Sequence, residues 1–277
     1  MFIDTHCHLD FHQFDADRDE AVARAAAAGV TIIINPATDL PSSRRAIALA
    51  DRYDGVYAQV GVHPNDAGDF GPSTLAELRA LAAHPKVVAI GEIGLDYYWD
   101  KTPRAQQQAA FEAQLELAAE LDLPVVIHCR DAQADVRDTM RRWVPGAQMF
   151  RGPDAILGVY HAYSGDLEMV QETAAWQVVL SLGGPVTFTN ARDLHALVSQ
   201  LPLGQIMLET DAPYLTPHPH RGKRNEPAYI PLIAQAIADL QQVDVAAVAD
   251  SSSALARRVF PKLAVTALAT PPIEIGV

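Results

Sequence analysis

The residues best suited to chemistry begin with two histidines near the start of the chain. His6 and His8 follow apolar Phe2 and Ile3 and stand two residues apart. If residues 2–6 form a strand, side chains alternate, so both imidazoles leave the backbone on the same side. Two neutral imidazoles at the end of a strand can chelate a divalent metal. A His-X-His pair is as often two surface histidines, so a metal site needs further ligands elsewhere.

Further residues of ligand type follow other apolar runs of the chain. They are His63, Glu92, His128, His161 and Asp211. Counting His6 and His8, five of the ten histidines stand at such positions, which exceeds the one or two expected by chance. Taken singly, His161 could be a core histidine, His128 an ion-pair partner and Asp211 a turn cap. A purely structural role explains Glu92 least well, because a buried carboxylate without a partner is energetically costly.

The elements that must position these residues alternate along the chain. The apolar runs predict strands at 2–6, 31–34, 56–60, 87–92, 124–128, 155–161, 177–181 and 205–209. Helices are predicted at 15–28, 41–53, 73–83 with Ser73 as N-cap, 103–121, 132–143, 167–175, 191–201, 228–241 and 245–259, with a loop at 145–154. Near-continuous apolar strands indicate a parallel sheet that is buried on both faces.

Eight strand–helix units predict an α/β protein with a single-domain (β/α)8 barrel over residues 1–260. Residues 261–277 lack amphipathic periodicity and are predicted to form a C-terminal tail. The alternative is an open doubly wound sheet. It is disfavoured because no glycine-rich turn follows the first strand, where a nucleotide would dock.

Active sites of such barrels form at the C-terminal ends of the strands, so the candidate residues should converge there. Four imidazoles and two carboxylates are too many for one tetrahedral metal with an open position, and they suit two divalent ions. We assign His6, His8 and Asp211 to one ion, His128 and His161 to the other, and Glu92 to a bridge between them. Asp211 is also placed to orient or deprotonate the attacking water. We expect His63 to face the substrate, and Zn, Mn or Mg all remain open as the metal.

Composition limits how a substrate could be held. The chain has 277 residues, 49% of them hydrophobic, and its 21 basic and 34 acidic residues give a net charge of −13. This charge excludes a generally basic surface for nucleic acid. A polyanionic substrate would therefore need metal ions and a few local cations. Candidates are Arg130, Arg221, Lys223 and Arg224. The last three could equally belong to a solvated basic loop that binds nothing.

The N-terminal residues, the longest apolar run and the cysteines predict the cellular location of the protein. The first ten residues carry Asp4 and no basic stretch, so no signal peptide is expected. The longest apolar run, 25–34, is too short to span a bilayer. Cys7 and Cys129 are predicted to be small packing residues without a disulfide. These features predict a cytoplasmic protein that needs no membrane and no obligate protein partner.

Together the motifs carry a resemblance to a known family. They are DTHCHLD (4–10), GVHP (61–64), GEIGLDYY (91–98), VIHCRDA (126–132), HAYSG (161–165), LETDAPYL (208–215) and RGKRNEP (221–227). In these the chain resembles the TatD-type metal-dependent hydrolases, described as deoxyribonucleases, of the amidohydrolase barrel superfamily. The resemblance implies a two-metal phosphodiesterase whose substrate is DNA, at 3′ ends or in single strands. Departures from the family pattern are a longer segment at 149–155, Ala162-Tyr163 where Cys-Phe is common, Leu255 in place of an Asn, and the tail.

Other activities remain open on the sequence. The same barrel could hydrolyse carbon esters, lactones or amides, and many such relatives bridge their metals with a carboxylated lysine on the fourth strand. Here Glu92 stands at that position, and Lys86 lies at the wrong end of the strand. Aminoacyl-tRNA deacylation and a non-enzymatic, metal-dependent binding role are the further alternatives.

Overall fold

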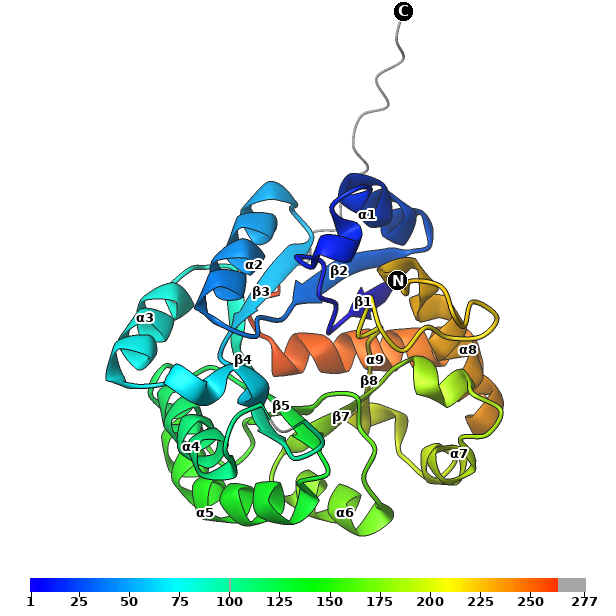
Figure 1. Cartoon of the computed structure of the whole chain (residues 1–277). Helices are drawn as coiled ribbons and strands as arrows, with labels where there is room; N and C mark the ends of the chain where they lie inside the picture. The colour runs from blue at the N-terminus through cyan, green and yellow to red at the C-terminus, as the bar shows by residue number, and fades with distance from the viewer. Residues whose placement is uncertain (100, 264–277) are drawn as a thin grey trace, which may run out of the picture.

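Eight parallel strands form the centre of the protein (Figure 1). The structure is a computed structural model that describes residues 1–99 and 101–263. The strands are β1 Phe2–Asp4, β2 Val30–Asn35, β3 Val56–Val60, β4 Val87–Asp96, β5 Val125–Arg130, β6 Gly158–Tyr160, β7 Val178–Leu182 and β8 Ile206–Leu208. They pair in chain order. The backbone N–H of Thr5 donates to Leu208 O at 3.0 Å, which closes β8 against β1.

Helices surround the strands, as the (β/α)8 prediction requires. They are α1 Arg18–Ala27, α2 Leu40–Arg52, α3 Pro72–Ala82, α4 Arg104–Glu120, α5 Gln133–Arg151, α6 Leu167–Ala175, α7 Arg192–Val198, α8 Ile230–Gln241 and α9 Val245–Val259. Short 3-10 turns lie between them: η1 His12–Phe14, η2 Pro64–Asp69, η3 Gly184–Thr187, η4 Leu203–Gln205 and η5 Pro227–Tyr229. The predicted barrel is therefore confirmed.

The core has two layers because successive strand residues point to opposite faces. In β2, Ile33 packs outward among the helices, whereas Ile32 and Ile34 fill the barrel interior. The inner cluster also contains Leu255 and Phe260, so α9 and the residue after it plug one end of the barrel. Ser253 on α9 bonds to Met1 O, which identifies the plugged end as the N-terminal end of the strands. The other end, which faces the viewer in Figure 1, is the open mouth.

The prediction of a loop at residues 145–154 was wrong for residues 145–151 and is confirmed only for residues 152–154. Helix α5 continues through Pro145 to Arg151 and ends at Gly152, whose φ is +94°. A proline inside a helix costs about 3 kcal/mol relative to alanine. The buried residues Trp143, Val144 and Ala147 continue the helical spacing past the proline and offset that cost. Pro145 itself is exposed, so its ring does not collide with a neighbouring element.

Several element boundaries also differ from expectation. Strand β1 ends at Asp4 rather than at residue 6, and α3 is capped by Gly71 rather than Ser73. Strand β4 runs four residues beyond Glu92, to Asp96, paired with β5. The glycine Gly94 permits this extension, because a Cβ there would lie 2.0 Å from His128 O. Of the predicted tail 261–277, residues 264–277 lie outside the described residues.

Within the described residues, no single helix has the length and apolar content needed to cross a membrane. The pair Pro227–Gln241 and Val245–Val259 meets the criteria jointly, on length and composition alone, with a bend of 112°. Cys7 lies in the outer core cluster, Cys129 packs against it, and both thiols are unpaired.

The glycine in β6 gives a test of how closely the barrel strands pack. A Cβ at Gly158 would lie 2.3 Å from Val125 O, a backbone atom of β5. We expect Gly158→Ala to lower the free energy of unfolding by about 1–3 kcal/mol, as overpacking does, measured by urea denaturation. The control is Gly146→Ala in exposed α5, where a Cβ would meet nothing within 4 Å. It should raise stability by about 0.5–1 kcal/mol; equal effects of both changes would contradict the close packing of β5 and β6.

Candidate metal centre

The carboxylate of Glu92 lies at the centre of the barrel mouth, between two pairs of imidazoles. Its Oε1 lies 2.6 Å from His128 Nδ1 and 2.8 Å from His161 Nε2. Its Oε2 lies 3.4 Å from His6 Nε2 and 3.7 Å from His8 Nε2. Each carboxylate oxygen therefore serves a different pair, which is the arrangement of a bridging ligand.

Asp211 joins the pair that faces Oε2. Its Oδ1 lies 3.5 Å from His8 Nε2 and 3.8 Å from His6 Nε2. The residue follows β8 in the left-handed region, with φ of +52°, which Asp tolerates better than most side chains. Its backbone N–H donates to His6 O at 2.8 Å. The structure thus brings together all six residues that the sequence assigned to metal binding.

Burial and proximity shift the ionisation of these groups. Burial alone would raise the pKa of Glu92, but the charge of His161 and the hydrogen bonds of His128 and His161 outweigh it and hold the pKa well below its usual value. Glu92 is therefore an anion. Burial, reinforced by the nearby His161, lowers the pKa of His6, so His6 is neutral at pH 7. Neutral imidazole is the form that binds metal ions.

Several ring nitrogens of the cluster have no hydrogen-bond partner among the described residues. They are His6 Nδ1, His6 Nε2, His8 Nδ1 and His161 Nδ1, all buried. An unpaired buried polar atom costs about 1–3 kcal/mol, and a cation would satisfy those nitrogens that face the cluster. Ligand atoms within 4.8 Å of one another occur in the sets His6–His8–Glu92, His6–His161–Asp211 and His63–Glu92–His128. The mixed imidazole and carboxylate donors fit divalent metal ions.

His63 reaches the same cluster but in a different chemical state. Its Nδ1 accepts the backbone N–H of Asn65 at 3.1 Å, so the proton of the neutral ring is on Nε2. Burial, followed by the neighbouring His128, lowers the pKa of His63 to about 3, which keeps the ring neutral. Nε2 lies 3.5 Å from Glu92 Oε1. A protonated ring nitrogen donates hydrogen bonds and does not ligate metal, so this geometry favours the predicted substrate-facing role over a fifth imidazole ligand.

Two carboxylates that the sequence analysis missed support the histidines from behind. Asp96 Oδ2 lies 3.2 Å from His128 Nε2, on the opposite side of the ring from Glu92. Glu209 Oε1 lies 3.6 Å from His161 Nδ1 and accepts the backbone N–H of Ala162 at 2.6 Å. A carboxylate at hydrogen-bond distance, such as Asp96, orients a ligating imidazole and raises its basicity. Glu209 acts on His161 from slightly further away, through its negative charge. Both are acids at the ends of apolar strands, so the argument applied to Glu92 could have found them.

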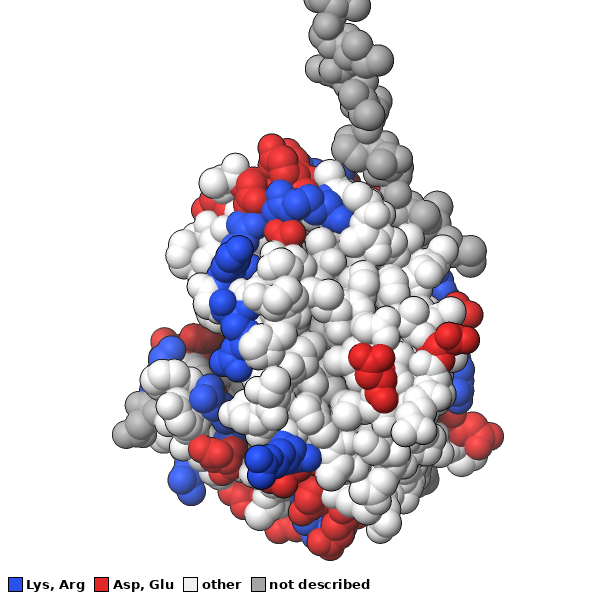
Figure 2. Space-filling view, turned by 90° about the vertical axis from the view of Figure 1, so that its right-hand side faces the viewer, with Lys and Arg blue, Asp and Glu red and all other residues white. Residues whose placement is uncertain are grey.

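The predicted basic residues are dispersed around the mouth. Figure 2 shows Lys and Arg side chains in a band along its left edge, the side that faces the viewer in Figure 1. The Arg130 guanidinium lies 3.8 Å from the centre of the Tyr98 ring, and that of Arg221 lies 3.8 Å from the Phe188 ring. Lys223 is exposed. Their charges are therefore available near the surface.

Arg224 is engaged elsewhere. Its guanidinium pairs with Asp17 at 2.5 and 2.9 Å and lies 3.4 Å from Glu226. These hydrogen bonds from Arg224, with those from Arg24, hold the pKa of Asp17 well below its usual value. The structure thus does not bring Arg224 into the metal cluster, and its charge is already compensated.

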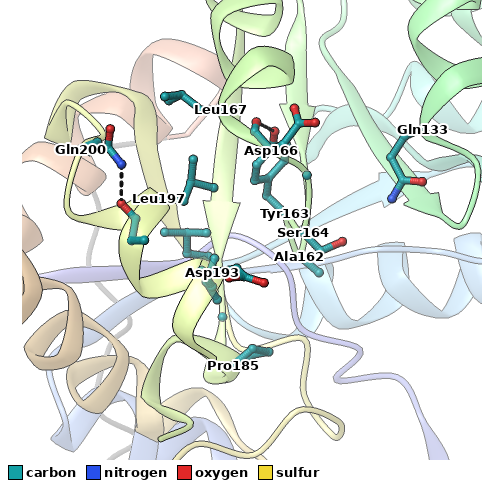
Figure 3. A pocket seen from close by; sticks show the side chains of 15 residues that line it. Gln133, Ala162, Tyr163, Ser164, Asp166, Leu167, Pro185, Asp193, Leu197 and Gln200 are labelled. Carbon is teal, nitrogen blue, oxygen red and sulfur yellow. Dashed lines mark hydrogen bonds between the residues drawn. The ribbon is translucent and has the colours of Figure 1, made fainter. Parts of the chain in front are cut away.

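A pocket of about 780 Å³ adjoins the cluster between the β6–α6 loop, the end of β7 and α7 (Figure 3). Ala162, the neighbour of His161, lines it. Leu167 and Leu197 form part of its apolar wall, and its charged groups, among the described residues, are Asp166 and Asp193. Two carboxylates make this pocket a poor site for a phosphate.

Comparison with known proteins shows which family the chain resembles over its whole barrel. The family model described as TatD related DNase matches residues 3–261. The chain is 42% identical over 260 residues to the uncharacterized metal-dependent hydrolase YabD of Bacillus subtilis, covering 94% of this chain and 99% of the relative. It is 40% identical to a protein of Cronobacter sakazakii named 3′-5′ ssDNA/RNA exonuclease TatD, covering 90% and 94%. Among solved structures, the TatD homolog YJJV of Escherichia coli K12 superposes with a TM-score of 0.86 at 33% identity, covering 94% of this chain and 98% of that one.

The position of Asp96 behind His128 gives a prediction for metal affinity. We expect Asp96→Asn to weaken metal binding about 10- to 100-fold, because the amide cannot raise the basicity of the ring as the carboxylate does. Competition titration with a chelator measures the affinity, and circular dichroism checks the fold. Asp250→Asn, on the exposed surface of α9, is the matched control. Unchanged affinity in Asp96→Asn would show that the carboxylate does not act through the ligand.

The tautomer of His63 gives a second prediction. Because its Nε2 carries a proton, His63→Ala should leave the number of bound metal ions per chain unchanged while lowering turnover by at least about tenfold, the smaller end of effects from losing a positioned donor. Metal content after gel filtration and turnover on an oligonucleotide are measured together. A loss of metal from this variant would instead assign His63 to the ligand set.

Proposed function

This chain belongs to the TatD family of metal-dependent hydrolases, and on that premise we propose that it hydrolyses phosphodiester bonds at the 3′ ends of single-stranded DNA. The observation that carries the proposal is the position of the Glu92 carboxylate, whose two oxygens face two separate pairs of imidazoles. Two divalent ions held close together are the usual means of activating both the attacking and the leaving oxygen in phosphoryl transfer.

We assign one ion to His6, His8 and Asp211 and the other to His128 and His161, with Glu92 shared. When bound, the ions lower the pKa of a water molecule and neutralise charge on the phosphate. Imidazole-rich donor sets favour Zn or Mn over Mg by softness, whereas weakly held Mg suits phosphate chemistry. All three metals are therefore to be compared.

The side chains of the protein accept the proton of the water and contact the phosphates. His8 and His6 outweigh burial and lower the pKa of Asp211, so its carboxylate is ionised and Oδ1 can accept a proton from the attacking water. The neutral His63 donates its Nε2–H to a phosphate oxygen. Arg130, Arg221 and Lys223 lie around the mouth and screen the charge of the nucleic-acid backbone. Arg224 takes no part, since Asp17 neutralises it.

Two observations favour a phosphodiester over a carbon ester, lactone or amide. A carboxylate, Glu92, occupies the position between the imidazole pairs, and Lys86 bonds instead to Tyr53 O, near the start of β3. The relative of Cronobacter sakazakii carries the name of an exonuclease for single-stranded DNA and RNA. RNA therefore belongs in the substrate test. Two unpaired thiols suit the reducing cytoplasm, where we propose that the protein acts.

The proposal is tested with oligonucleotides labelled at the 5′ end, as single strands, duplexes and RNA, each with Mg, Mn or Zn. We expect stepwise shortening from the 3′ end that a chelator stops. Glu92→Ala should lower the rate by at least about 10³-fold, because a bridging ligand and both metal positions are affected together. Glu116→Ala, exposed on α4, is the matched control and should keep wild-type activity.

The alternatives have distinct outcomes. No shortening of any oligonucleotide with any metal, together with metal-dependent hydrolysis of a lactone or carbon ester, would replace the proposal with the carbon-ester hydrolase. Release of the amino acid from aminoacyl-tRNA without loss of nucleotides would indicate deacylation. A protein that binds metal and hydrolyses none of these substrates would be a binding protein.

A further inference from the structure

Two large aromatic side chains are exposed beside the metal centre. Tyr98 is 54% exposed and Trp99 is 48% exposed, directly after β4. Their rings meet edge to face, with centroids 4.9 Å apart. Large aromatic side chains are normally withdrawn from water, since burying one stabilises a protein substantially. Neither ring belongs to the described core clusters, so packing does not account for them.

The backbone beneath these rings is fixed to the metal centre by one carboxylate. Asp96 Oδ1 accepts the N–H of Tyr98 at 2.9 Å and that of Trp99 at 3.2 Å. The other oxygen, Oδ2, lies 3.2 Å from Nε2 of His128. The turn that carries the rings and the imidazole that faces Glu92 are therefore held by the same side chain. The rings are therefore positioned beside the metal centre.

Cations alternate with these rings. The Arg130 guanidinium lies 3.8 Å from the centre of the Tyr98 ring and 5.9 Å from that of Trp99. Lys101 Nζ lies 5.9 Å from the Trp99 ring. Arg130 is also opposite Asp96 in the pairing of β4 with β5, so it projects from the same edge of the mouth. Exposed aromatic faces interleaved with cations match the alternation of bases and phosphates in a single strand.

We propose that Tyr98, Trp99, Lys101 and Arg130 form a stacking platform for unpaired nucleobases next to the scissile phosphate. The proposal rests on the proposed nuclease function and specifies its substrate. Bases of the strand stack on the exposed aromatic surface, and Arg130 and Lys101 contact the intervening phosphates. Because bases inside a duplex are already stacked and paired, the platform selects single strands or frayed ends. The neighbouring pocket with Asp166 and Asp193 lacks these features.

The test measures binding without turnover, in the full-length Glu92→Ala variant. Two fluorescent oligomers of equal length are compared by anisotropy: oligothymidylate, and the same sugar-phosphate backbone with abasic sites. We expect Trp99→Ala or Tyr98→Ala to weaken oligothymidylate binding about 5- to 150-fold, the range for losing one stacked base. Binding of the abasic oligomer should not change. Trp99→Phe should retain most of the affinity, because phenylalanine keeps an aromatic face.

Phe150→Ala is the matched control, since Phe150 is 81% exposed at the far end of α5. It should leave both affinities unchanged. Unaltered binding of oligothymidylate in Tyr98→Ala and Trp99→Ala would overturn the platform, and so would an equal loss for both oligomers or an absence of binding to either. A thermal melt of each variant checks the fold.

This assay separates the two proposals. If the wild-type protein cleaves no oligonucleotide while the rings still govern binding, the nuclease function fails and the platform stands only as a binding surface for single strands. If cleavage proceeds but the rings do not affect binding or the preference for bases over abasic sites, the platform fails and the nuclease function stands.

Discussion

The arrangement at the mouth of the barrel depends on keeping the Glu92 carboxylate ionised while it is buried. Removing a carboxylate from water costs several kcal/mol unless opposite charges and hydrogen bonds compensate. Here the compensation comes from five imidazole nitrogens at 2.6–3.7 Å, which lie on four different segments of the chain. These histidines must be presented from the ends of four strands, β1, β3, β5 and β6, so the charge of one residue constrains the geometry of most of the mouth. The same crowding of donors is what makes the cluster able to hold cations.

The barrel meets this constraint because its two ends have different roles. At the N-terminal ends of the strands, α9 supplies Leu255 and Val259 to the interior cluster and excludes water. At the C-terminal ends, polar residues such as His6 and Glu92 replace the apolar interior. Stability is thus concentrated away from the mouth, and the loops there are free to carry chemistry, as is general for this fold.

Around the cluster lies a supporting set of polar contacts. Asp96 holds His128, Glu209 lies behind His161, and the turn at Asn65 fixes the tautomer of His63. Asp96 also anchors the turn of Tyr98 and Trp99. A change at this one carboxylate therefore affects both the metal ligand and the exposed rings, which couples the chemistry of the site to its surface.

The sequence by itself determined the barrel, its order of strands and helices, and the six residues that meet at its mouth. Apolar periodicity and residues placed at the ends of strands are local signals, and they do not depend on how distant segments pack. Tertiary structure alone decided which oxygen of Glu92 faces which histidines, which nitrogen of His63 carries the proton, and that Asp96 and Glu209 stand behind the ligands. It also decided that Arg224 is neutralised by Asp17, 207 residues away, and that packing of Trp143 and Ala147 carries α5 through Pro145. These features depend on contacts between residues distant in the chain or on burial that outweighs local preference, and neither is encoded in a short stretch of sequence.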